Sequence, residues 1–165
     1  MITYATFDDL LELDELAEKV ITHMKESKIP QWELNYPRYE HFEQDVIKKA
    51  LIIYKEDEKI IGCMAILPEN DPPYHTISSW QKEYSIVIHR VLVDPSVQKK
   101  GIAKQLLNFA KQYGKLHGFE SIKIDTHLEN YKMRRFLQKN DFIEGDYIEV
   151  MDRIAYECIL EDEHE

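Results

Sequence analysis

Hydrophobic residues recur along the chain with two different periods, and their succession predicts a mixed α/β fold. Residues 2–7, "ITYATF", alternate apolar and polar side chains as a strand does. A stripe with helical spacing follows, and either Asp8 or Asp9 is expected to cap that helix. The stripe consists of Leu10, Leu13, Leu16, Ala17, Val20, Ile21 and Met24. Pro30 is expected to stop this first helix.

The middle of the chain combines a second helix with a β-hairpin. Residues 38–50 have a helical pattern, and residues 51–67 form two apolar runs around the polar turn "EDEK". Residues 68–80 are rich in turn-forming side chains and predict a long loop.

The second half of the chain predicts strand–helix–strand units. A β-rich run over residues 83–94 ends at Pro95, and a one-faced apolar pattern starts a helix near Ile102. Residues 121–126 predict a strand, residues 130–140 a short helix, and residues 142–150 and 152–160 two closing strands. We expect one domain over residues 1–160, with the acidic tail 161–165 disordered.

Composition narrows the classes of partner. The 165 residues carry 31 acidic and 21 basic side chains, giving a net charge of −10 that disfavours nucleic acid and anionic membranes as partners. No apolar run approaches the roughly 20 residues that span a bilayer, and the start does not resemble a signal peptide. Cys63 and Cys158 lie in apolar runs without zinc-ligand spacing, so we expect buried thiols, no metal and a cytoplasmic location.

A group of lysines around one glycine marks the start of the helix at Ile102. Lys99, Lys100 and Lys104 surround Gly101, and Ala103 is small. A helix N-terminus offers unpaired N–H groups and partial positive charge, which suits phosphate. Neither the P-loop nor the GxGxxG pattern is present. The local spacing alone leaves two alternatives, a phosphate cradle and a solvated lysine-rich turn.

Two longer motifs favour the cradle. "VLVDPSVQKKGIAKQLL" resembles the signature of the GNAT superfamily of acyl-CoA N-acyltransferases, in which an apolar strand and Pro precede Gln/Arg-x-x-Gly-x-Gly/Ala. "SIKIDTHLENYKMRRFLQKNDF" is similar to that family's second motif, with Asn130 and Phe142 in place and Asp141 where Gly is usual. The resemblance implies a single α+β domain with a mixed, mostly antiparallel, splayed central sheet flanked by helices.

The resemblance also implies acetyl-CoA as cosubstrate and a set of binding residues. The pyrophosphate would lie on Gln98, Lys99, Lys100, Gly101, Ile102, Ala103 and Lys104. The pantetheine arm would pair like an added strand with Val91, Leu92 and Val93. Asn130 matches a side chain that bonds the pantetheine, although an Asn there also suits the N-cap of a helix.

The implied chemistry is direct attack of a neutral primary amine on the acetyl thioester. The Leu92 N–H would polarise the carbonyl, and His89 is the candidate base, although a His alternating with Val87 and Val91 also suits a packed strand. Glu83, Asp125 and His127 are weaker candidates for the base. Leu137 occupies the position where many family members carry a Tyr that protonates the leaving thiolate.

The acceptor is less defined. Trp32 and Tyr36, with Tyr39, lie in the segment that usually forms the acceptor wall, or they are ordinary packing. The aromatic faces and the negative charge favour a small cationic amine or a peptide amino group. The competing hypothesis is a non-catalytic CoA-binding or regulatory module. An exposed strand edge would allow a homodimer.

Overall fold

The structure is a computed structural model that describes residues 1–29, 36–68, 72–97 and 101–161. Trp32, Gln98, Lys99, Lys100 and the tail from 162 onward lie outside the described residues. The helices are α1 (Leu10–Glu26), α2 (Tyr39–Ile47), α3 (Ile102–Leu116) and α4 (Tyr131–Lys139). The strands are β1 (Ile2–Tyr4), β2 (Leu51–Glu56), β3 (Lys59–Pro68), β4 (Ser85–Val93), β5 (Ser121–His127), β6 (Ile143–Ile148) and β7 (Arg153–Ile159). Three short 3₁₀ segments are η1 (Phe7–Asp9), η2 (Pro72–Thr76) and η3 (Glu149–Met151).

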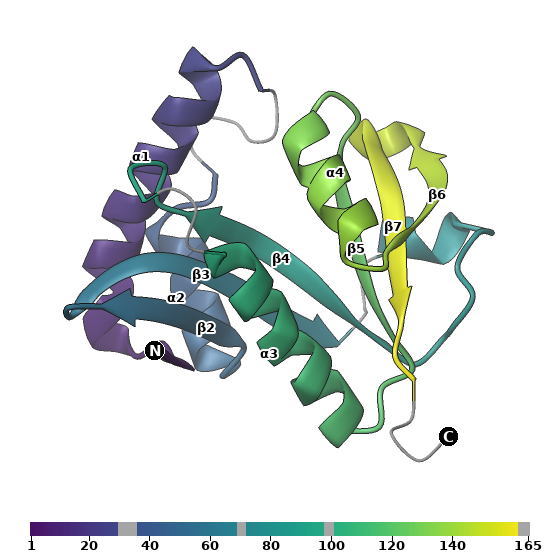
Figure 1. The fold of residues 1–165 in the computed structure, drawn as a ribbon, viewed down its shortest axis with the longest axis horizontal. Helices are drawn as coiled ribbons and strands as arrows, with labels where there is room; N and C mark the ends of the chain where they lie inside the picture. Colours follow the sequence, from purple (N-terminus) through teal and green to yellow (C-terminus); the bar gives the residue numbers. More distant parts are fainter. Residues whose placement is uncertain (30–35, 69–71, 98–100, 162–165) are drawn as a thin grey trace. The chain divides into compact units, whose positions relative to one another are not determined.

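The strands form one mixed sheet in the order β1-β2-β3-β4-β5-β7-β6 (Figure 1). The pairs β1·β2, β2·β3, β5·β7 and β6·β7 are antiparallel, whereas β4 and β5 are parallel. The parallel register covers only Ser85–Val87 against Ser121–Lys123, although both strands continue. This arrangement confirms the predicted fold class, a mixed and mostly antiparallel open sheet flanked by helices.

The chain divides into two compact units, and β4 and α3 pass from one unit to the other. The first unit comprises residues 1–66 and 89–108, and the second comprises 67–88 and 109–165. In the first unit, α1 and α2 pack against β2 and β3 on one face (Figure 1). The second unit has its own small core, which contains Tyr74, Val87, Ile148 and Ala155.

Asp9 occupies the N-cap position of α1, but its side chain makes no capping hydrogen bond to that helix, and a left-handed residue explains how α1 ends. The Asp9 carboxylate instead accepts a hydrogen bond from the Thr6 backbone N–H at 2.8 Å, at the start of η1. The helix ends at Glu26, before the expected stop at Pro30. Lys28 adopts a left-handed backbone with φ 58°, and the Ile29 N–H bonds back to the Met24 carbonyl.

Left-handed residues also correct two other predicted boundaries. The second helix ends at Ile47, because Lys49 has φ 54° and the chain turns into β2. The predicted strand over 142–150 is shorter, since η3 follows Ile148 and Asp152 has φ 53°. The hairpin turn is confirmed, with Asp57 and Glu58 both left-handed between β2 and β3.

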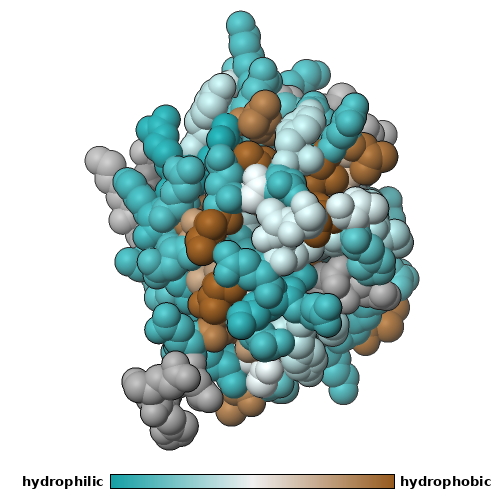
Figure 2. Space-filling view, turned by 90° about the vertical axis from the view of Figure 1, so that its right-hand side faces the viewer, coloured by the Kyte–Doolittle hydropathy of each residue, from teal (hydrophilic) through white to brown (hydrophobic). Residues whose placement is uncertain are grey.

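Several large apolar side chains are exposed among the described residues, including Leu11, Leu116 and Val150. Figure 2 shows one face on which hydrophilic residues predominate and apolar residues form small separate groups. Both cysteines are buried free thiols, as predicted. No helix among the described residues has the length and apolar character required to cross a bilayer.

The two faces of β3 contact different helices, because successive side chains of a strand point in opposite directions. Cys63 and Ala65 belong to the core beneath α1 and α2. Gly62 lies on the other face, where an added Cβ would be 2.9 Å from the Ile102 side chain and 3.2 Å from the Leu92 carbonyl oxygen. A glycine at this position therefore allows the first turn of α3 to approach the sheet.

We predict that Gly62→Ala destabilises the protein by about 1–3 kcal/mol, because the added methyl overpacks this contact. Urea denaturation should show a lower midpoint with an unchanged slope. Gly114→Ala is the matched control. Its Cβ first meets the flexible end of Leu160, so its cost should be smaller. A Gly62→Ala protein as stable as the wild type would contradict the close approach.

Candidate functional site

Strand β4 contains a backbone kink at Arg90, within the segment that the sequence assigns to the cosubstrate. Arg90 has φ 52°, a left-handed conformation that non-glycine residues seldom adopt inside a strand. The kink interrupts the expected alternation of buried and open side chains. His89, Arg90 and Val91 are all half-buried, whereas Leu92 is fully buried. His89 and Val91 are therefore not related by the simple alternation that the sequence suggested.

The backbone of β4 beyond the kink faces two directions. The Asp94 N–H donates to the Ile61 carbonyl at 2.8 Å, and the Leu92 carbonyl lies beside Gly62, so both residues face β3. The Leu92 N–H acts on the Cys63 thiol and lowers its pKa, against the larger effect of burial. Because successive backbone groups of a strand point to opposite sides, those of Val93 and Val91 are directed away from β3.

This geometry bears on the role predicted for Leu92. Its carbonyl lies beside Gly62, so its backbone groups are directed toward β3 rather than toward the side on which a cosubstrate could pair as an added strand. Val91 and Val93 carry the backbone groups that face the other way. Within this segment, Val91 and Val93 are thus candidates for pairing with the cosubstrate, whereas Leu92 is a buried anchor.

Cys63 supports the kink from the neighbouring strand. Its thiol donates to the Arg90 carbonyl at 3.5 Å, which supplies a partner for a group that the kink removes from the regular ladder. Burial, and then the nearby Asp45 carboxylate, raise the pKa of Cys63 to about 12. The thiol therefore stays protonated and remains a donor at physiological pH.

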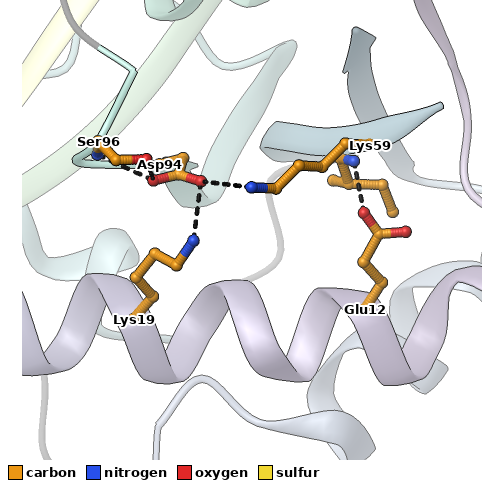
Figure 3. Close-up of polar contacts among 6 residues, drawn as sticks. Glu12, Lys19, Lys59, Asp94 and Ser96 are labelled. Carbon is orange, nitrogen blue, oxygen red and sulfur yellow. Dashed lines mark hydrogen bonds and ion pairs between the residues drawn. The ribbon is translucent and has the colours of Figure 1, made fainter. Parts of the chain in front are cut away.

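The turn after β4 is fixed by the carboxylate of Asp94, which is 1% exposed (Figure 3). One of its oxygens accepts hydrogen bonds from the Ser96 N–H at 2.9 Å and the Ser96 hydroxyl at 2.7 Å. The other lies 3.1 Å from Lys19 Nζ on α1 and 3.9 Å from Lys59 Nζ on β3. This turn leads into the predicted phosphate loop, so Asp94 joins that loop's entrance to α1 and β3.

The same contacts set the ionisation of Asp94. Burial on its own would raise the pKa of this carboxyl, but the Ser96 hydrogen bonds and Lys19 outweigh burial and hold the pKa below its usual value. A second contact from α1, between the Glu12 carboxylate and the Ile60 N–H at 2.5 Å, holds β3 nearby (Figure 3).

The helix start predicted at Ile102 is confirmed, and Gly101 is its N-cap. The Gly101 carbonyl accepts the first helical hydrogen bond, from the Gln105 N–H at 3.0 Å. Gly101 has φ 61°, so glycine is favoured here for its backbone conformation, and an added Cβ would meet no atom within 4 Å. Ile102 is buried, Ala103 half-buried and Lys104 exposed. The first N–H groups of a helix have no partner within the helix.

Asn130 has the N-cap role that the sequence allowed. Its side-chain oxygen accepts from the Met133 N–H at 3.3 Å at the start of α4, and the residue is 5% exposed. Just after α4, Asp141 has φ 71°, a conformation that glycine adopts easily. This explains why glycine is usual at this position of the motif. Leu137 is 1% exposed and supplies no proton.

Two of the weaker base candidates, Asp125 and His127, are engaged in local contacts. The Tyr74 hydroxyl donates to Asp125 at 2.5 Å, and Arg153 lies 3.2 Å from the other Asp125 oxygen. His127 Nε2 lies 3.1 Å from Asp152. Among the described residues, no group of three or more potential ligands could hold a metal ion.

Arg90 and Asp45 are residues that sequence reasoning missed. The Arg90 guanidinium bonds both oxygens of Asp45 on α2 at 2.5 Å and donates to the Tyr36 hydroxyl at 2.9 Å. Burial would lower the pKa of Arg90, but Asp45 and Tyr36 raise it above its usual value. The available signal was a charged Asp45 beside Phe42 and Val46, on the apolar stripe of a helix.

Comparison with known proteins shows the family of the chain. Residues 15–142 match the model of the Acetyltransferase (GNAT) family, and the chain belongs to that family. No curated protein sequence matches the chain.

Solved structures of similar fold include a provisionally assigned acetyltransferase from Staphylococcus aureus Mu50, with 28% identity and a TM-score of 0.76. The match covers 98% of this chain and 99% of that one. A GNAT-family acetyltransferase from Streptococcus agalactiae 2603 is 20% identical, with a TM-score of 0.86 and coverage of 98% and 96%. The PaiA N-acetyltransferase from Thermoplasma acidophilum, a complex with coenzyme A, is 17% identical, with a TM-score of 0.76 and coverage of 96% and 98%.

We predict that Asp94→Asn lowers the free energy of unfolding by about 1–3 kcal/mol near pH 7, because charged hydrogen bonds are lost. The folded pKa lies below the unfolded value of about 3.9, so this carboxylate stabilises the fold above that value. The contribution is lost as the pH falls through the folded pKa. Urea denaturation at several pH values should therefore show a difference that shrinks below about pH 4.

Asp141→Asn is the control for this measurement, because the Asp141 side chain is 88% exposed and Asn also tolerates a left-handed backbone. A wild-type advantage over Asp94→Asn that stayed the same at about pH 3 would show that Asp94 acts by packing and not by charge.

Proposed function

We propose that the protein is an N-acetyltransferase that transfers an acetyl group from acetyl-CoA to a primary amine by direct attack. The observation that carries the proposal is one succession of three features. Strand β4 is kinked at Arg90, the turn at residues 94–97 is anchored by Asp94, and the start of α3 is capped by Gly101. Membership of the GNAT family and neighbours described as acetyltransferases support acyl transfer.

The described residues fit an acyl-CoA cosubstrate. Backbone groups of Val91 and Val93 that face away from β3 can pair with the amides of the pantetheine arm. The start of α3, with Gly101, Ala103 and Lys104, suits the pyrophosphate. Gln98, Lys99 and Lys100 would complete the cradle, and Asn130 would combine its capping role with a hydrogen bond to the cosubstrate.

The reaction requires the amine to lose a proton before attack. Nitrogen forms a bond to the acetyl carbon, the carbon–sulfur bond breaks, and the electron pair leaves on sulfur. We assign proton acceptance to His89, directly or through water, because it lies next to the kink and its ordinary pKa is about 6.5. We assign carbonyl polarisation to a backbone N–H of Val91 or Val93, since the backbone groups of Leu92 are directed toward β3.

The phosphate cradle is tested by Gly101→Glu. We expect this change to weaken acetyl-CoA binding at least about tenfold relative to Gly101→Ala, or about 1.4 kcal/mol, because the carboxylate repels the pyrophosphate. Both variants carry the same left-handed strain at φ 61°, so their difference isolates charge and bulk. Calorimetric titration with acetyl-CoA measures it, and equal affinities of the two variants would refute the cradle.

We further propose a small cationic amine or a short peptide's amino group as acceptor. The net charge of −10 concentrates cations, and Glu15, Glu18 and Glu26 of α1 line an open hollow beside Pro95 and Ser96. Tyr36 and Trp32 would supply aromatic faces for an ammonium group.

The acceptor proposal predicts the outcome of a thiol-release screen with acetyl-CoA. Cationic amines should turn over fastest, and their KM should rise as salt is increased to about 0.5 M, because salt screens the attraction. Trp32→Ala should raise the KM for the amine and leave the Kd for acetyl-CoA unchanged. Binding of acetyl-CoA without thiol release with any amine would favour the non-catalytic module instead.

A further inference from the structure

Arg90 occupies a backbone conformation that its own chemistry disfavours. For a residue with a long side chain, φ 52° inside a strand is strained, and such strain persists only where surrounding contacts impose it. The other left-handed non-glycine residues of the first unit, at 28, 49, 57 and 58, lie in turns or at helix ends. Arg90 is the one that lies within a strand, among the residues described in that unit.

Contacts fix Arg90 through its side chain. The guanidinium is 12% exposed and the Asp45 carboxylate 2% exposed, and two parallel hydrogen bonds of 2.5 Å join them. A planar fork on a buried carboxylate permits few orientations of either group. Asp45 is on α2, which packs in the core through Phe42 and Val46, so the anchor itself is rigid.

A second set of contacts fixes the same residue through its backbone. The Cys63 thiol donates to the Arg90 carbonyl at 3.5 Å, and beyond the kink the Leu92 carbonyl lies beside Gly62. Strand β3 thus contacts β4 on either side of Val91. Val91 is held with its own N–H and carbonyl pointing away from β3.

We propose that Arg90 is a positioning residue for acyl transfer: its ion pair with Asp45 holds β4 in the kinked course that directs the Val91 and Val93 backbone groups at the acyl-CoA arm. The inference rests on the proposed function and names a residue for the same site. Asp45, Arg90 and Cys63 form the unit that we call the β4 clamp.

A role in stability alone does not account for the clamp. A buried ion pair is often replaceable by apolar residues of similar volume without loss of stability, and a β-branched residue would suit an unkinked strand better. The arrangement instead combines a strained backbone with a buried charge, and both act on the segment next to the reacting group. The guanidinium also donates to Tyr36, so one side chain contacts the proposed acceptor segment and fixes the acyl-CoA strand.

Two double variants test the clamp without leaving a buried charge unpaired. Asp45→Asn/Arg90→Gly and Asp45→Asn/Arg90→Ala differ by a single methyl group. Glycine adopts φ 52° without strain, whereas alanine favours the extended strand. We expect the glycine variant to keep kcat within about fivefold of the wild type. The alanine variant should lose about 10–100-fold in kcat, because a displacement of the reacting groups by about 1 Å costs roughly that much.

Activity is measured well below the melting temperature of both variants, so that each is fully folded. Asp9→Asn is the stability control. It breaks a contact with Lys55 at 3.2 Å in the same unit, remote from β4 in sequence, and should lower the melting temperature without lowering kcat. Equal kcat values for the two double variants would overturn the clamp and leave the proposed function intact.

Amide hydrogen exchange separates failure of the inference from failure of the proposed function. Coenzyme A should protect the amides of Val91 and Val93 in the wild type and the glycine variant, and protect them less in the alanine variant. If the wild type releases no thiol with any amine, the proposed function fails, and exchange alone decides the clamp. Equal protection in both double variants would then overturn it.

Discussion

The course of β4 depends on one buried ion pair, between Arg90 and Asp45. A left-handed backbone costs a non-glycine residue about 1–2 kcal/mol. Removing one partner from a buried ion pair costs about 3–5 kcal/mol, because the other charge is left without compensation. Breaking the pair while both charges stay buried would therefore cost more than relief of the strain would gain, so the kink at φ 52° persists.

A compensated buried charge also lies at the other end of the segment 91–93. Asp94 is almost completely buried and is compensated by Ser96, Lys19 and Lys59. Residues 91–93 thus lie between two anchored points, Arg90 and Asp94. A ligand that pairs with this backbone meets groups that are already ordered, so less conformational entropy is lost on binding. Rigidity at the ends leaves the middle available for recognition.

Sequence patterns predicted the elements that bury a regular stripe. The α1 helix follows from Leu13, Leu16 and Val20, and the start of α3 follows from Gly101 and Ile102, because helical spacing and glycine each have a direct physical meaning. The element ends were predicted less well. Lys28 and Lys49 adopt left-handed conformations that sequence normally assigns to glycine, so the stops were placed too late.

The residues of the candidate site also differ in how well the sequence predicted them. Gly101 and Asn130 were predictable in their structural roles, since each acts through its own local backbone. The role of Arg90 depends on Asp45, which is 45 residues away, and no local period reports such a pair. The kink in turn explains why simple alternation failed for His89 and why backbone direction could not be assigned to Leu92 beforehand. Tertiary contacts, not local propensity, decide these details.

The position of Leu137 makes alignment of the backbone more important in this chain. A buried leucine cannot protonate the leaving sulfur. A thiol of pKa about 8.5 is a moderate leaving group, so protonation would contribute little near neutral pH. The larger demand falls on the charge that develops on the carbonyl oxygen, which a preorganised N–H stabilises only when it is correctly aimed. Under the proposed acyl transfer, the contacts that fix the strand would contribute to the rate, and the Arg90–Asp45 pair would belong to the site although it touches neither substrate.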